Sequence, residues 1–180
     1  MIVLKPIVNV VTKTRDETTE ALSLSKNIAN NIEKIALKLL SSKYKITQST
    51  IHDFDQGALQ DLCLKIDADK SKELNNYSTH AVFDALKVEL KGKYAALLLM
   101  DAKINPAFEP HYQLKTSLAT DFYVVNKNIK PQTILRLLVI DLEEEKVVFH
   151  QKIVTKNYDP RVNSEVEQIT RIILKRLYYK

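Results

Sequence analysis

The residues that could perform chemistry are scattered along this chain. Its four histidines are His52, His80, His111 and His150. His52, Asp53 and Asp55 could act as metal ligands or in acid–base chemistry, because imidazole and carboxylate groups suit both roles. No second cluster or H-E-x-x-H motif accompanies them, and Asp53 or Asp55 also fits as the cap of the helix that follows. We therefore expect no catalytic residue and no metal site.

Glycine is almost absent, with only Gly57 and Gly92 in 180 residues. A loop that cradles phosphate needs several glycines close together, since only glycine lets the backbone approach the ligand so closely. Neither a G-x-G-x-x-G nor a G-x-x-x-x-G-K-[ST] motif can be written, and the G-x-S-x-G motif of serine hydrolases is also missing. We expect no cofactor.

A polar segment over residues 67–77 begins like a calcium-binding loop, with Asp67, Asp69 and Ser71 at the first ligand positions. The sixth position is Lys72, where such a loop needs glycine, and the twelfth is Ser78, where it needs a bidentate glutamate. These departures favour an ordinary polar loop over a calcium site.

The single cysteine, Cys63, lies among Leu59, Leu62 and Ile66. One cysteine cannot form an intramolecular disulfide or a cysteine-based metal site. The apolar neighbours predict a small buried side chain, with a nucleophile as the less favoured alternative.

The formal charge is +5, and the last thirty residues hold seven Lys or Arg against three Asp or Glu. We call Arg171, Lys175, Arg176, Tyr178, Tyr179 and Lys180 the basic C-terminal face. Such a face could bind nucleic acid or anionic lipid. At this modest charge we favour a solvated helix face, in which cations near the helix C-terminus complement its dipole.

The segment 104–113 is the most promising contact loop. Its prolines restrain the backbone and limit the entropy lost on binding. The aromatic and imidazole side chains there are the candidate partner contacts, namely Phe108, His111 and Tyr112. The alternative, which we favour, is a strand connection whose aromatic residues close the edge of the core.

Hydrophobic periodicity in the first half predicts two helices and two strands that must position these residues. Residues 2–12 form an apolar strand, which Pro6 interrupts or places at an edge. Thr14 and Glu17 have capping-box spacing and predict a helix from there to about Ser42. Its buried stripe is Leu24, Ile28, Ile32, Ile35 and Leu39. A short strand over 46–51 and a helix over 55–66 follow.

A further helix, capped by Ser78, is expected to end at Gly92. Strands are then expected over 94–102, 112–124 and 134–142, with a charged turn at 143–145 leading to a strand through Val147 and Ile153. The spacing of Ser164 and Glu167 predicts the start of a closing helix. The chain is thus predicted to form a single α/β domain of the α+β type over residues 1–180. Its helices pack on a largely antiparallel mixed sheet that ends in a strand meander and the closing helix.

Three segments resemble bacterial envelope lipoproteins that contain the amino-terminal domain of TolB or its CsgG-like relatives. They are Gly92-Lys-Tyr-Ala-Ala-Leu-Leu-Leu-Met, the hairpin that starts at Arg136-Leu-Leu-Val-Ile-Asp, and Val166-Glu-Gln-Ile-Thr-Arg-Ile-Ile-Leu-Lys-Arg-Leu. The chain departs from the family in two ways, since no lipobox cysteine lies near Met1 and the hairpin turn has no glycine. The resemblance implies a non-enzymatic part of an envelope assembly, and it carries over no catalytic residue.

We therefore expect a non-catalytic accessory or interaction protein of the bacterial envelope, periplasmic or associated with the outer membrane. Its partner would be another protein of the assembly or a second copy of the chain. No signal segment is visible after Met1, so any export signal or membrane anchor would belong to a segment absent from this sequence. The alternative is a cytoplasmic nucleic-acid-binding module that uses the basic C-terminal face.

Overall fold

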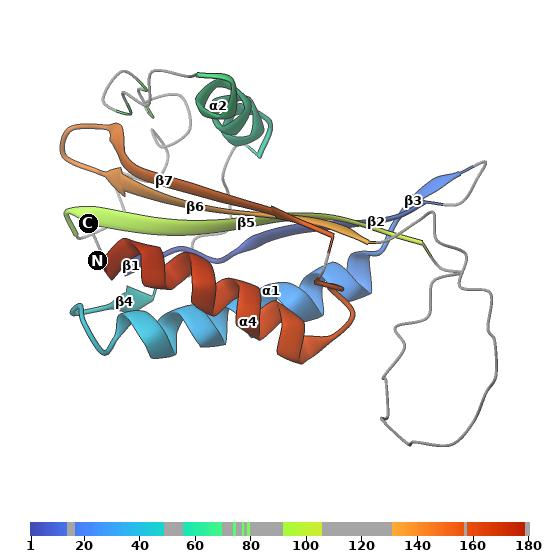
Figure 1. Cartoon of the computed structure of the whole chain (residues 1–180). Helices are drawn as coiled ribbons and strands as arrows, with labels where there is room; N and C mark the ends of the chain where they lie inside the picture. Colours follow the sequence, from blue (N-terminus) through green and yellow to red (C-terminus); the bar gives the residue numbers. More distant parts are fainter. Residues whose placement is uncertain are drawn as a thin grey trace.

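The computed structural model describes residues 1–13, 17–48, 56–69, 92–105, 131–156 and 158–178, together with Leu74, Tyr77 and Thr79. Figure 1 shows the arrangement of the helices and strands. In chain order they are β1 (Ile2–Val3), β2 (Ile7–Lys13), β3 (Thr18–Glu20), α1 (Leu22–Leu40), β4 (Thr47–Gln48), α2 (Gln56–Ala68), β5 (Tyr94–Ile104), β6 (Gln132–Asp141), β7 (Lys146–Thr155), α4 (Asn163–Lys175) and the 3-10 turn η2 (Arg176–Tyr178).

Strand β5 is the centre of a mixed sheet. It pairs antiparallel with β6, which pairs antiparallel with β7. On its other side β5 pairs in parallel with β1 and then with β2. Pro6 lies between these two strands, as expected for a residue that cannot donate a backbone hydrogen bond. The sheet is completed by β4 parallel to β1 and by β3 antiparallel to β2.

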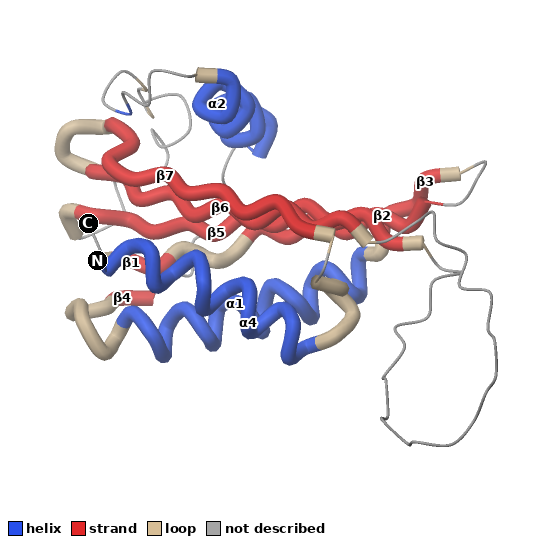
Figure 2. The backbone as a smooth tube through the Cα atoms, in the orientation of Figure 1, coloured by secondary structure: helices blue, strands red, loops and turns tan. Residues whose placement is uncertain are grey.

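Helices cover both faces of the sheet, as Figures 1 and 2 show. Helices α1 and α4 lie side by side on one face, and α2 lies on the other. This explains why β5 is a continuous apolar run rather than an alternating one. Leu98 and Met100 belong to the core under α1 and α4, whereas Leu97 and Leu99 belong to the core under α2. The predicted α/β class, with helices packed on a mixed sheet, a strand meander and a closing helix, is confirmed.

Two predicted helix starts are wrong. Helix α1 begins at Leu22, and Thr18–Glu20 instead forms strand β3 against β2. Thr14 itself lies outside the described residues. Helix α4 begins at Asn163 with Val162 at its N-cap, so the pair Ser164 and Glu167 does not form the predicted capping box. In both cases the helix begins without a side-chain cap, so the spacing of polar residues was misleading.

The expected helix boundary at Ile66 is also too early, because α2 continues to Ala68 and includes Asp67. The predicted strand over 46–51 is observed as β4 at Thr47–Gln48, and residues 49–51 lie outside the described residues. The predicted strand over 112–124 and the helix after Ser78 lie outside the described residues, as does the trio formed by His52, Asp53 and Asp55.

Candidate functional site

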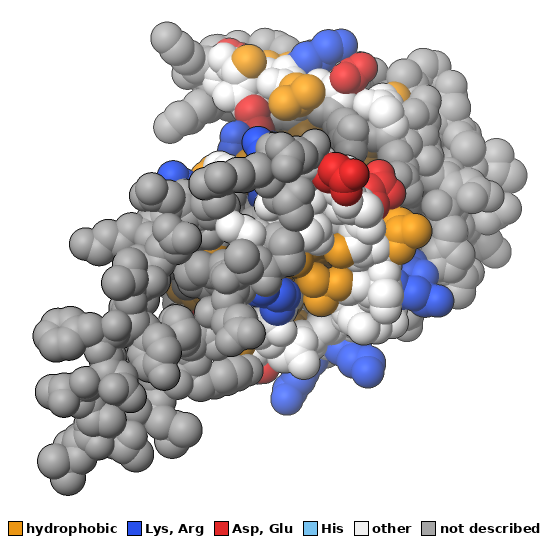
Figure 3. Space-filling model, turned by 90° about the vertical axis from the view of Figure 1, so that its right-hand side faces the viewer, with side chains coloured by type: hydrophobic (Ala, Val, Ile, Leu, Met, Phe, Trp, Pro, Cys, Tyr) orange, Lys and Arg blue, Asp and Glu red, His pale blue; other side chains and the backbone are white. Residues whose placement is uncertain are grey.

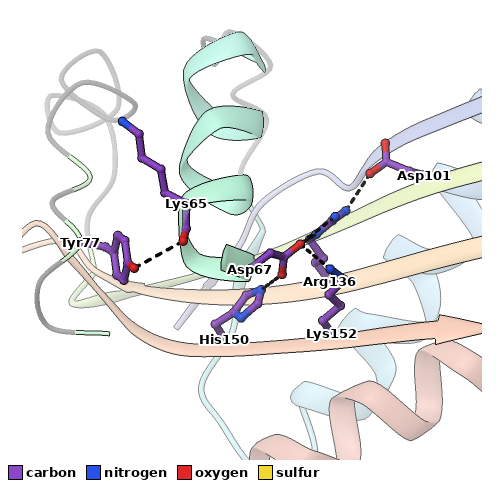
Figure 4. A network of polar contacts seen from close by, with 7 residues as sticks. All are labelled: Lys65, Asp67, Tyr77, Asp101, Arg136, His150 and Lys152. Atoms are coloured by element: carbon purple, nitrogen blue, oxygen red, sulfur yellow. Dashed lines mark hydrogen bonds and ion pairs between the residues drawn. The ribbon is translucent and has the colours of Figure 1, made fainter. Parts of the chain in front are cut away.

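Asp67 is the centre of a buried polar network beneath α2, drawn in Figure 4. Its side chain is only 9% exposed. Its Oδ2 atom accepts hydrogen bonds from Arg136 Nε at 3.1 Å and Nη2 at 2.9 Å, and from Lys152 Nζ at 2.7 Å. Asp67 lies in the last turn of α2, where the helix dipole disfavours a carboxylate. The two cations offset that repulsion.

The strands place both cations on the same face of the sheet. Arg136 of β6 and Lys152 of β7 are directly opposite each other in the antiparallel ladder. Cross-strand neighbours project to the same side, so both side chains reach the helix above. The neighbours of Arg136 along β6, Leu135 and Leu137, project to the opposite face and join the core under α1 and α4.

A second carboxylate balances the network. Arg136 is 8% exposed, and its Nη1 atom donates to Asp101 Oδ2 at 2.7 Å. Asp101 lies on β5 and its side chain is 46% exposed, so it lies at the rim of the network rather than in its interior. The two carboxylates and the two cations make the group formally neutral, as a buried ionic cluster requires.

The protonation states follow from burial and from these contacts. Burial raises the pKa of the Asp67 carboxyl, but the hydrogen bonds from Lys152 and Arg136 prevail and hold that pKa below its usual range. Burial acts to lower the pKa of Arg136, and the hydrogen bonds and charges of its carboxylate partners more than offset this, so its pKa is raised. Asp67 and Arg136 therefore both remain charged at neutral pH.

His150 adjoins the same cluster from β7. Its Nε2 atom lies 3.7 Å from Asp67 Oδ1 and, although it is buried, has no hydrogen-bond partner among the described residues. Burial lowers the pKa of His150; Arg136 and Lys152 lower it further, while Asp67 acts in the opposite direction. The ring is therefore neutral at pH 7 and contributes no charge to the network.

A polar pocket of about 410 Å³ lies on the β7 side of this cluster. Its described lining is Ile66, Asp67, Asp69, Leu74, Tyr77, His150, Gln151 and Lys152. The hydroxyl of Tyr77 donates to Asp69 Oδ2 at 2.6 Å, and this bond raises the pKa of the phenol. The hydroxyl oxygen of Tyr77 also lies 3.4 Å from the carbonyl oxygen of Lys65, the contact drawn in Figure 4. These contacts hold the Tyr77 side chain against the end of α2.

A second pocket, of about 300 Å³, lies between α2 and the sheet. We call it the docking notch. It is lined by Ile7, Asn9, Leu59, Cys63, Leu64, Leu99, Asp101 and Arg136. Cys63 is 4% exposed, which confirms the predicted buried side chain. Burial raises the pKa of its thiol to about 11, so the thiol is protonated at neutral pH and is a poor nucleophile.

Several residues of the basic C-terminal face make internal contacts. Tyr178 donates its hydroxyl to the carbonyl of Leu39 at 2.8 Å and stacks on Tyr44 with ring centroids 6.1 Å apart. Arg171 donates two hydrogen bonds to Glu167 one helical turn earlier. Lys175 and Arg176 are exposed. The predicted face is thus solvated in part and bonded to the protein in part.

The remaining predicted contact residues lie outside the described part of the chain. They are Phe108, His111, Tyr112, Tyr179 and Lys180. Within the described part, no group of three or more His, Cys, Asp or Glu side chains is arranged to hold a metal ion.

The buried network was missed by sequence reasoning, although one signal was present. Arg136 is a lone cation inside the apolar strand 134–142, between Leu135 and Leu137. A charged residue in a strand covered on both faces requires a buried counter-charge. Nothing local identifies that partner, because Asp67 lies 69 residues earlier.

Comparisons with known proteins reveal no family. No protein-family model and no curated protein matches the chain. A solved structure that resembles it is the hypothetical protein CT253 from Chlamydia trachomatis, with 11% sequence identity and a TM-score of 0.42. The match covers 98% of this chain and 94% of that one. No helix in the described residues is long and apolar enough to span a membrane.

Proposed function

We propose that this chain is a non-catalytic interaction domain of a bacterial envelope assembly that contacts a partner protein through the docking notch. The observation that carries the proposal is the opening of this pocket beside Leu64 of α2, whose side chain is 60% exposed. The exposed leucine and the adjacent recess together offer a second protein an apolar contact beside a concave surface.

The chemistry of the notch favours contact over catalysis. Arg136 is bonded to two carboxylates, Asp67 and Asp101, which fix its orientation. Cys63 is held as a neutral thiol by burial. A rigid, charge-balanced floor under an apolar opening suits recognition of a partner, because little entropy is lost when the partner binds.

The envelope location is part of the same proposal and is supported by the resemblance to envelope lipoproteins. The alternative, a nucleic-acid-binding module, receives less support from the contacts of the basic C-terminal face. The ring of Tyr178 stacks on Tyr44, and Arg171 is paired with Glu167. These contacts compete with the base stacking and phosphate binding that the alternative needs.

A photo-crosslinking amino acid at Leu64, in the native host, tests this proposal. The matched control is Leu22 at the start of α1, which is 72% exposed and is not part of the notch. We expect one discrete protein adduct from Leu64 in the envelope fraction and none from Leu22. The same adduct from both positions, no adduct at Leu64, or recovery of the chain with nucleic acid in the cytosol would overturn the proposal.

A further inference from the structure

Among its described lining residues, the docking notch combines apolar walls with a single accessible charge. Its walls come from Ile7 and Leu99 of the sheet and from Leu59 and Leu64 of α2. Ile7 and Leu99 are direct neighbours in the parallel ladder, so they form one continuous apolar surface. A long aliphatic group can lie along this surface and bury its carbons.

The accessible charge in the notch is negative. Asp101 is 46% exposed, whereas Arg136 below it is 8% exposed and donates to both Asp67 and Asp101. Asp101 uses only Oδ2 for this contact, and within the described part of the chain its Oδ1 atom accepts no hydrogen bond. A group entering the notch therefore meets a carboxylate oxygen with acceptor capacity.

Asn9 adds a neutral polar group at the same rim. It is directly opposite Asp101 in the ladder between β2 and β5, and it is exposed. Among the described residues no hydrogen-bond partner occupies its side-chain amide. Its carbonyl oxygen can accept a second hydrogen bond from the same donor. Figure 3 looks onto the end of the sheet that carries β3, where charged and hydrophobic side chains of the described residues lie close together.

We infer that the docking notch recognises a lysine or arginine side chain of the partner protein. The aliphatic stem lies against Leu59, Leu64 and Leu99. The cation binds the carboxylate of Asp101 and donates a second hydrogen bond to the side-chain carbonyl oxygen of Asn9. This inference rests on the proposed function and names the chemistry of the partner residue. An anionic group is disfavoured, because it would face the exposed carboxylate while the balancing guanidinium lies beneath it.

Fragments of matched length test this chemistry directly. The probes are n-butylamine and n-propylguanidine, which reproduce the two side chains, and pentanoate, which has a length similar to butylamine and the opposite charge. Binding is followed in the full chain by NMR shifts of the side-chain amide of Asn9, which lines the same pocket. We expect the two cations to bind with dissociation constants on the order of millimolar and pentanoate not to bind.

Two variants separate the proposed contact from general charge effects. Asp101→Asn keeps an oxygen that accepts from Arg136 but removes the exposed charge, and it should weaken butylamine binding by about tenfold. Asp61→Asn removes an exposed charge from α2 outside the notch and should leave binding unchanged. Equal or tighter binding of pentanoate, or unchanged butylamine binding to a folded Asp101→Asn variant, overturns the inference.

The two proposals fail in different ways. If Leu64 crosslinks to an envelope partner but the cationic fragments do not bind, the interaction function stands and lysine or arginine recognition is wrong. If the fragments bind and no partner is captured, cation recognition stands and the interaction function is wrong.

Discussion

The two faces of the sheet are stabilised by different means. Under α1 and α4 the strands present mostly apolar side chains, such as Met100, Leu135 and Leu137, which are almost completely buried. Under α2 the apolar surface is shorter. It gives way along β6 and β5 to Arg136 and Asp101, which are bonded to each other.

This difference separates two roles within one sheet. The face under α1 and α4 is packed by hydrophobic contact, which is strong but does not specify a ligand. The face under α2 is oriented by a charged network whose geometry depends on particular atoms. We infer that the first face supplies most of the stability and that the second supplies the recognition surface.

The largest effect is expected where the charged network is broken. Asp67→Ala leaves the buried guanidinium of Arg136 without its main partner, which should lower the free energy of unfolding by about 3–5 kcal/mol. Urea denaturation at pH 7, followed by circular dichroism, measures this change. Asp61→Ala on the exposed side of the same helix is the matched control and should change stability by less than about 0.5 kcal/mol. Similar values for both variants would contradict the structural role of Asp67.

The apolar face can be tested in the same assay. Leu137 is 0% exposed in the core under α1 and α4, so Leu137→Ala should destabilise the protein by about 3 kcal/mol through lost burial and a cavity. Leu64→Ala in the docking notch removes a side chain that is already 60% exposed, and we expect a loss below about 0.5 kcal/mol. A comparable loss from both would mean that the notch is part of the core.

A smaller effect is expected at the end of the chain. Tyr178→Phe removes the hydrogen bond to the Leu39 carbonyl but keeps the ring that stacks on Tyr44. We expect a loss of about 1 kcal/mol, the usual contribution of one such bond. Thermal unfolding at constant pH measures it. An unchanged unfolding midpoint would mean that stability does not depend on this hydroxyl, and the tyrosine would then be available for the nucleic-acid role that we disfavour.

The smallest effect at neutral pH is expected for His150→Gln, within about 0.5 kcal/mol of the original protein. Its signature is a change in pH dependence. The pKa of His150 is lowered by folding, so the unfolded chain binds the extra proton first and stability falls as the pH drops below about 6.5. The variant should lose less stability between pH 7 and pH 5. Parallel curves for the two proteins would show that the ring stays solvated.

Acid unfolding at still lower pH should then reflect Asp67, which both proteins retain. Its pKa is lowered by folding, so its stabilising contribution is present above the ordinary value of 3.8 and is lost as the pH falls through the folded value.

The sequence predicted the parts of the fold that depend on local periodicity or on the chemistry of a single residue. The stripe through Ile28 and Ile32 predicted α1 because helical periodicity repeats within a few residues. The interruption at Pro6 followed from the missing backbone donor. The start of α1 was wrong because Thr14 and Glu17 have the spacing of a cap, whereas Thr18–Glu20 instead pairs as an antiparallel strand with the neighbouring strand β2.

The candidate site was beyond such local reasoning. Arg136 stood out as a cation in an apolar strand, but Asp67 and Lys152 became its neighbours only through the topology of the sheet. The docking notch likewise combines Ile7, Leu64 and Asp101 from three separate elements. No spacing along the chain encodes that combination.

The parallel pairing of β1 with β5 also has a consequence for biosynthesis. Ile2 leaves the ribosome well before its partner Ala95, which is made about ninety residues later. At a synthesis rate of roughly 5–20 residues per second, β1 remains unpaired with β5 for on the order of 5–20 s. During that interval its apolar side chains are exposed, and chaperones that keep polypeptides unfolded can bind the nascent chain.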